Sequence, residues 1–275
     1  MLDLERTEHL AEGVPMTAES HLKAPARLSL ALLLCLLPTI DTWAEGESDF
    51  LGGRSKSCQN CSLQNAPLKR KDLSGADLSG ADLTGAVLHR ARLPRAKLTG
   101  ATLTGANLNK TDLKNASLAQ AKLAEAMLYE SDASAADFSG ADLTGGKMGK
   151  VRLVRANLDG AKIQAAVLTG ARLDEASLRG ADLSNTNLVE ATLRRANLEG
   201  ANLDNAGLVD AALREANLKG AKLTEADLFG ADLTGANLAG ADLTDSRLTR
   251  AILTGANLEG AKLSGALMPD GSVHE

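Results

Sequence analysis

The stretch ADLSG at residues 76–80 is followed directly by ADLTG at residues 81–85, and this five-residue unit organises most of the chain. The unit recurs without insertion or deletion from Leu63 to Met268, which gives 42 central positions, one in each repeat. Leu fills 37 of these centres, and Ala fills 34 of the 42 positions that lie two residues before a centre. Internal repetition at a fixed short period is typical of a solenoid, in which each repeat contacts its neighbours.

A period of five excludes a straight helix or a straight strand. In an α-helix, Leu at every fifth position would advance about 140° per repeat and visit every face. In a strand, an odd period sends successive Leu side chains to opposite faces. The chain must therefore turn once per repeat, with Ala and Leu pointing inward and with Gly, Asn, Ser and Thr at the corners, as turn chemistry requires.

The repeating pattern A-[D/N]-L-[S/T/x]-G resembles the pentapeptide-repeat family over about three quarters of the chain. The resemblance implies an all-β fold, namely a right-handed β-helix of square cross-section with four repeats per coil and about ten coils. The spacing of glycine residues supports four repeats per coil. In the series of every fourth repeat, with centres from Leu78 to Leu258, Gly follows the centre by two residues in nine of ten cases, and Gln120 is the exception.

The N-terminal region, residues 1–44, has the pattern of an export signal. Lys23 and Arg27 precede an apolar run at residues 28–37, and the small residues Thr42 and Ala44 bracket Trp43. This order predicts cleavage after Ala44. The alternatives are an uncleaved anchor and a buried helix, although the run is shorter than the roughly 20 residues that a membrane span needs. The predicted location is periplasmic or secreted, with no stable membrane span after cleavage.

Residues 45–57 are expected to form a short polar linker, and the β-helix is expected to cover residues 58–268. Cys58 and Cys61 open it in register with the repeats, and both should point inward. An oxidising compartment favours a disulfide between them. Free buried thiols and a redox or metal site are the rival interpretations, and a lone CxxC is a weak signal for the last of these.

Catalytic and cofactor chemistry find no support in the residue pattern. His9, His21, His89 and His274 are scattered, so no spacing suggests a catalytic set, and no cofactor or metal is predicted. The recurrent Asp and Asn before Leu are interpreted as bonding to backbone groups at turns, with cation-binding columns as the alternative. Residues 63–268 carry 24 acids and 25 bases, so the repeat region is close to neutral. Nucleic acid is an unlikely partner, because a basic strip needs fewer acids and more aromatic platforms.

One outward face carries more apolar side chains than the others, and we predict that it contacts a protein partner. Its members recur at every fourth repeat, or at multiples of that interval, in the series of Leu68 and Leu88: Val87, Met127, Tyr129, Val167, Val189, Val209 and Phe229. The competing interpretation is that β-branched residues merely suit strands. The C-terminal coil, at Leu267 and Met268, is the predicted site of an end-to-end homodimer, since its strand edges are unpaired and the tail at 269–275 is short.

The sequence is compatible with two functions. The first is an exported, non-enzymatic scaffold that binds another protein. The second is imitation of DNA by a cytoplasmic protein that binds topoisomerase, which the resemblance suggests for some members of the family. Such mimicry needs a strongly negative rod, whereas this repeat region is close to neutral. The sequence therefore favours the scaffold.

Overall fold

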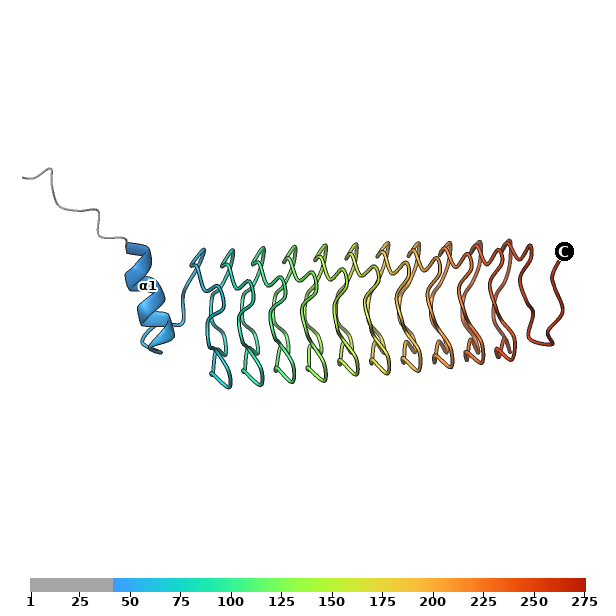
Figure 1. The fold of residues 1–275 in the computed structure, drawn as a ribbon. Helices are drawn as coiled ribbons and strands as arrows, with labels where there is room; N and C mark the ends of the chain where they lie inside the picture. The colour runs from blue at the N-terminus through green and yellow to red at the C-terminus, as the bar shows by residue number, and fades with distance from the viewer. Residues whose placement is uncertain (1–41) are drawn as a thin grey trace, which may run out of the picture. The chain divides into compact units, whose positions relative to one another are not determined.

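The structure is a computed structural model that describes residues 42–275, and the predicted export run at residues 28–37 lies outside them. The described part consists of one helix, α1 (Thr42–Leu51), and of coils that follow one another from Ser57 to the C-terminus (Figure 1). The structure differs from the expectation for residues 45–57. Instead of a linker throughout, this segment contains most of α1 and then a turn at Gly52 and Gly53.

The coils are held together by parallel β-bridges between residues that lie four repeats apart in the chain. Each strand contributes a single bridging residue, from the pair Ser57 and Asp77 to the pair Arg247 and Leu267. Backbone hydrogen bonds flank every bridge; for example, Leu158 N–H donates to the Ser177 carbonyl at 2.7 Å. One coil therefore uses four repeats, and bridges occur in four parallel series along the chain. This is a β-helical solenoid.

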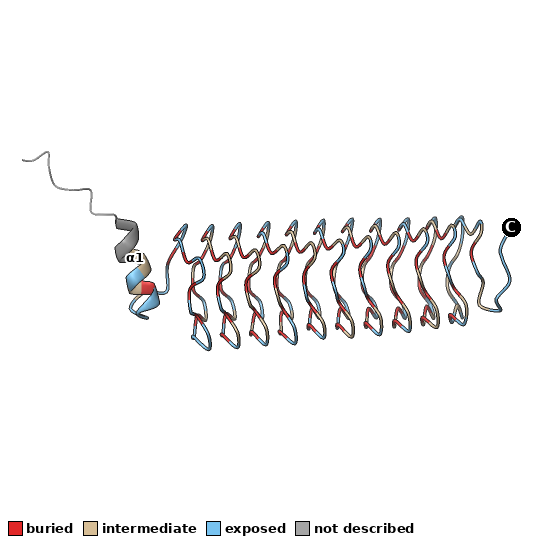
Figure 2. Ribbon diagram, viewed as in Figure 1, coloured by how far each residue is buried: buried red, intermediate tan, exposed pale blue. Residues whose placement is uncertain are grey.

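The interior of the solenoid is a continuous aliphatic core. Burial alternates along each repeat (Figure 2), because the central residue and the residue two before it are buried in most repeats. Leu158 and Ala156 in the middle of the rod are no more than 1% exposed, and Phe138, which replaces a central Leu, is equally buried. Each buried Leu contributes roughly 1.5–3 kcal/mol relative to an exposed one.

The corners explain why Asp and Asn precede so many central residues. Asp232 Oδ1 accepts a hydrogen bond from Thr234 N at 3.1 Å and from Thr234 Oγ1 at 2.6 Å, and Asp242 and Thr244 repeat this geometry. The hydrogen bond from the Thr244 hydroxyl, followed by that from the Lys262 ammonium, lowers the pKa of Asp242. These side chains satisfy turn backbone groups, as interpreted from the sequence.

Four hydroxyl residues occupy inward Ala positions, and one of them has no hydrogen-bond partner. Ser131 Oγ donates to the Leu128 carbonyl at 2.8 Å, whereas Ser246 Oγ, also fully buried, makes no hydrogen bond. A buried hydroxyl without a partner retains its desolvation cost of roughly 1–3 kcal/mol.

We therefore expect Ser246→Ala to raise the free energy of unfolding by about 1 kcal/mol, because it removes an unsatisfied polar group. The matched change Ser131→Ala should lower it by about 1 kcal/mol, since a satisfied hydrogen bond is lost. Urea denaturation of both variants measures the two effects. Equal changes in the free energy of unfolding for the two substitutions would contradict the conclusion that the Ser246 hydroxyl lacks a hydrogen-bond partner.

Candidate interaction surfaces

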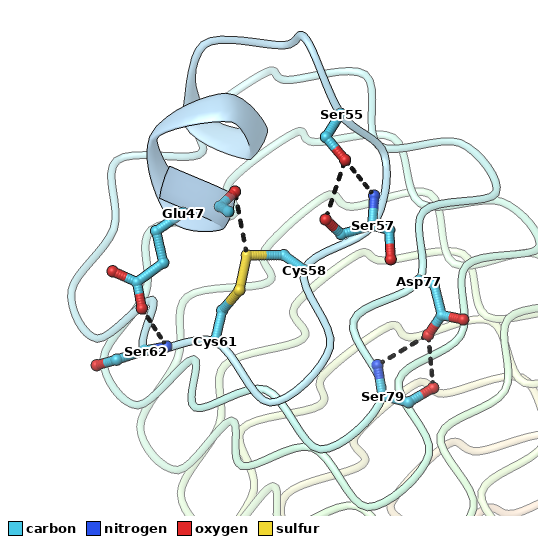
Figure 3. Close-up of a disulfide and its surroundings, with 9 residues drawn as sticks. Glu47, Ser55, Ser57, Cys58, Cys61, Ser62, Asp77 and Ser79 are labelled. Atoms are coloured by element: carbon cyan, nitrogen blue, oxygen red, sulfur yellow. Dashed lines mark hydrogen bonds between the residues drawn. A yellow bond between two sulfur atoms is a disulfide. The ribbon is translucent and has the colours of Figure 1, made fainter. Parts of the chain in front are cut away.

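The N-terminal end of the rod is covered by α1. Phe50, in its last turn, is 3% exposed and belongs to the same hydrophobic cluster as the interior of the first coil. The Glu47 carboxylate accepts a hydrogen bond from Ser62 N at 2.8 Å (Figure 3), and the Lys71 ammonium donates to the Leu51 carbonyl at 3.3 Å. Lys71 takes a position that is Ala in most repeats, and here its ammonium caps the end of the helix.

A disulfide joins Cys58 and Cys61 beneath this helix (Figure 3). Their Cα atoms lie 5.4 Å apart across one corner, and both residues are at most 5% exposed. Cys58 Sγ lies 3.9 Å from the Gly46 carbonyl oxygen, so the bond is enclosed between α1 and the first coil.

We expect thiol titration of the unreduced, denatured mature protein to find no free thiol from Cys58 or Cys61, because the bond closes the first corner under α1. Reduction before denaturation is the control and should release two thiols. Two free thiols in the unreduced sample would rule out the bond in the cell.

The predicted apolar face consists of two adjacent columns. Val87, Met127 and Val167 lie in a strand column, where they alternate with Asn107 and Lys147. The other four residues lie at the neighbouring corner, one residue after a centre: Tyr129, Val189, Val209 and Phe229. The most exposed of the seven are Val87 at 37%, Tyr129 at 40% and Val167 at 43%. The face is therefore an apolar patch around Tyr129 and Val167 rather than an unbroken stripe.

Phe229 contributes less to this face than the sequence suggests. The guanidinium carbon of Arg247 lies 4.8 Å from the centroid of its ring, and that of Arg250 lies 5.6 Å from it. Arg247 also forms an ion pair with Asp227 at 2.8 Å. Two cations thus stack on the ring, and Phe229 is only half exposed.

A hollow of about 450 Å³ lies within the patch, between Tyr129 and Val167. Its walls are almost wholly apolar, and its other lining residues are Lys147, Gly149, Lys150 and Thr169. A Cβ atom on Gly149 would come within 3.3 Å of Tyr129 Cδ2. Gly149 does not have a positive φ, so its lack of a side chain makes room for the Tyr129 ring rather than relieving backbone strain.

The face that carries most of the arginines is internally paired. Arg155 and Glu175 lie 2.8 Å apart, and Arg195 and Glu215 lie 2.7 Å apart, each pair joining adjacent coils. These exposed pairs place an acid beside a base along the rod, so the face is not the basic strip that nucleic acid would need.

The C-terminal end is only partly covered. The tail folds back so that Val273 pairs antiparallel with Leu267, and Met268 N–H donates to the Ser272 carbonyl at 2.8 Å. The tail was expected to cover little, and it covers one of the four strand series. The other inward residues of the last coil are partly exposed, in contrast to their fully buried equivalents in earlier coils: Leu253, Ala256, Leu258, Ala261 and Leu263.

Among residues 42–275, no group of three or more His, Cys, Asp or Glu side chains is arranged to hold a metal ion. Within the same residues, no helix has the length and apolar character to cross a membrane.

The repeat pattern matches the family model described as pentapeptide repeats, in segments that together run from residue 57 to residue 268. The chain therefore belongs to the pentapeptide-repeat family, and the family prediction is confirmed. This family is defined by a structural repeat, and no enzyme family is indicated. No curated protein matches.

Among solved structures, the chain is similar to HetL, a pentapeptide repeat protein involved in heterocyst differentiation regulation from Nostoc sp. strain PCC 7120. The two are 36% identical over 84% of this chain and 98% of HetL, with a TM-score of 0.45. This chain is also 41% identical to Rfr23, a pentapeptide repeat protein from Cyanothece 51142, over 36% of this chain and 64% of Rfr23, with a TM-score of 0.29. Identity to full-length QnrB1, a plasmid-mediated fluoroquinolone resistance protein, is 18% over 66% of this chain and 90% of QnrB1, with a TM-score of 0.36.

Proposed function

We propose that the protein is an exported, non-enzymatic scaffold that binds a protein partner through its apolar patch. The observation that carries the proposal is the Cys58–Cys61 disulfide, because such bonds persist in oxidising compartments and are rare in the cytosol. The contacts between α1 and the rod that the structure describes begin at Gly46, two residues after the predicted cleavage site. Cleavage after Ala44 would leave them in place.

We also infer a right-handed rod of square cross-section with about ten coils, which dimerises end to end. The four bridge series and the four-repeat coil support the cross-section. The partly exposed Leu253, Leu258 and Leu263 support the dimer, because a second copy would bury them and pair the open strand edges. Leu267 and Met268, the residues first proposed for this contact, lie where the tail folds back.

Mimicry of DNA by a cytoplasmic, topoisomerase-binding protein is the weaker proposal. The repeat region carries 24 acids and 25 bases, and many of them are paired along the rod. A surface of this kind lacks the continuous negative potential that imitation of a nucleic acid requires.

The experiment is fractionation of cells that express the full chain, followed by N-terminal sequencing of the mature protein. We expect a periplasmic or secreted protein that begins at Glu45. A cytoplasmic protein that retains residues 28–37 would overturn the proposal.

A further inference from the structure

The corner beside the apolar patch carries a basic column over its N-terminal half. Arg70, Arg90, Lys110, Glu130 and Lys150 follow one another at intervals of one coil, each with φ between 54° and 59°. Their side chains are therefore attached at equivalent backbone positions on successive coils. Four steps of about 4.8 Å separate the first of them from the last, so the column is about 19 Å long.

Most of these cations form no ion pair. Lys110 lies 3.2 Å from Glu130. Among residues 42–275, no carboxylate lies within 4.0 Å of the cationic groups of the other basic side chains on this edge: Lys69, Arg70, Arg90, Lys147 and Lys150. All five are exposed. This concentration of unpaired charge contrasts with the paired arginine face.

Positive charges on this edge contribute to the pKa shifts of two groups, although they are the largest cause of neither. Desolvation, followed by the positive charges of Arg90 and Lys69, lowers the pKa of His89, which lies within the column. Hydrogen bonds from the Tyr129 hydroxyl and then from Lys110 lower the pKa of Glu130. The edge therefore favours negative charge, and its single carboxylate is already occupied by Tyr129 and Lys110.

The apolar hollow lies at the C-terminal end of this basic column. Lys147 and Lys150 line it together with Tyr129 and Val167. An apolar side chain in the hollow would leave the adjoining residues of the same segment beside unpaired ammonium and guanidinium groups. Farther along the same corner the charge reverses at Glu190 and Asp210, so only the N-terminal half fits an anion.

We propose that the edge from Arg70 to Lys150 binds an extended acidic segment of a protein partner, with one apolar side chain of that segment in the hollow between Tyr129 and Val167. This inference rests on the proposed scaffold function and names the chemistry of its partner. At about 3.3 Å per residue, six or seven extended residues span the column. Nucleic acid fits the edge less well, because Tyr129 and the His89 ring are the aromatic platforms it offers and successive bases need more of them.

The test uses the purified full chain and fluorescein-labelled peptides, with binding followed by fluorescence anisotropy. The first peptide has one phenylalanine followed by six glutamates, the second has serine in place of phenylalanine, and the third has phenylalanine followed by two glutamates. We expect the first to bind more tightly than the second by about tenfold, because only the phenylalanine fills the hollow. Binding should weaken as salt is raised.

Charge reversal should identify the edge. The double change Lys147→Glu and Lys150→Glu is expected to weaken binding of the first peptide at least tenfold. The matched control is Lys122→Glu with Lys162→Glu, which changes two exposed lysines in another bridge series and should alter binding less than twofold. Arg90→Glu should weaken binding of the first peptide and leave that of the third unchanged, because the short peptide does not reach that coil.

Several results would overturn the proposal. One is equal loss of binding in the two double variants, and another is equal affinity for the phenylalanine and serine peptides. Oligothymidine that binds as tightly as the first peptide would indicate a general polyanion surface. Light scattering provides a further test. If the double change Lys147→Glu and Lys150→Glu abolished self-association, the edge would bind a second copy of this chain, and Glu190 and Asp210 of that copy would supply the acidic groups. Cell fractionation tests export independently of peptide binding. A protein that is exported but binds none of the peptides would therefore contradict this inference and leave the proposed export unaffected.

Discussion

Phe50→Ala is expected to open the N-terminal end of the rod. Phe50 is 3% exposed and belongs to the hydrophobic cluster of the first coil, and removal of a buried Phe costs roughly 3–5 kcal/mol. In a solenoid each repeat depends on its neighbours, so this loss should act first on the adjoining coil. Hydrogen exchange at the amides of Cys58 and Leu63, which donate to Asp77 and Asp82, should accelerate roughly a hundredfold to several thousandfold.

Leu51→Ala is the matched control, since the adjacent side chain is 37% exposed. We expect it to change exchange at the same amides by less than tenfold. Exchange at Leu158, in the middle of the rod, should be unchanged in both variants. Uniform acceleration along the whole rod would show that α1 does not act as a local cap.

The second large effect is expected at the other end, where Leu258→Glu with Leu263→Glu should convert the proposed dimer to a monomer. Both side chains occupy inward positions that the last coil leaves partly exposed, and a second copy would bury them. Two anchors of at least about 2 kcal/mol each correspond to a dissociation constant raised by about a thousandfold. Light scattering over a range of concentrations measures the change.

Ile252→Glu provides the comparison on the same coil. Ile252 is 47% exposed and points outward, so a charge there should leave the dimer intact. Circular dichroism of the three proteins checks that the rod remains folded. A monomeric unmodified protein at high concentration, or a dimer that resists Leu258→Glu with Leu263→Glu, would contradict the end-to-end model.

The regular part of the fold could be predicted because one physical requirement repeats. Leu and Ala two residues apart must both reach the interior, and the corner residues must turn the chain, so each repeat fixes its own local geometry. Once Gly is seen to recur at every fourth repeat, the partner of each strand follows, as the bridge between Asp77 and Lys97 illustrates.

The ends could not be predicted in the same way, because contacts without periodicity determine them. Phe50 is one of only two apolar residues, with Leu51, between Gly46 and the pair Gly52 and Gly53, a composition typical of a linker. Its burial depends on the open first coil, which the local sequence does not show. The sequence signal at this end is Lys71, a charged residue at a repeat position that is Ala in most other repeats, and its ammonium donates to the Leu51 carbonyl of α1.

The covering of Phe229 illustrates the same limit on the apolar face. Arg247 follows it by slightly less than one coil and Arg250 by slightly more, so the winding of the chain brings both beside the ring. The register predicts that these residues are neighbours. It does not predict that the side chains of both arginines turn toward the ring, because long exposed side chains have many rotamers.

The four-repeat coil also limits how a gene for such a rod can lengthen or shorten. An in-frame deletion or duplication of four repeats removes or adds one full coil, and every later residue keeps its own bridge series. A change of one repeat preserves the local pattern but shifts all later residues to the neighbouring series. Tyr129 and Val167 would then no longer share a side if the change fell between them. Length variants of this protein should therefore differ by whole coils more often than by single repeats.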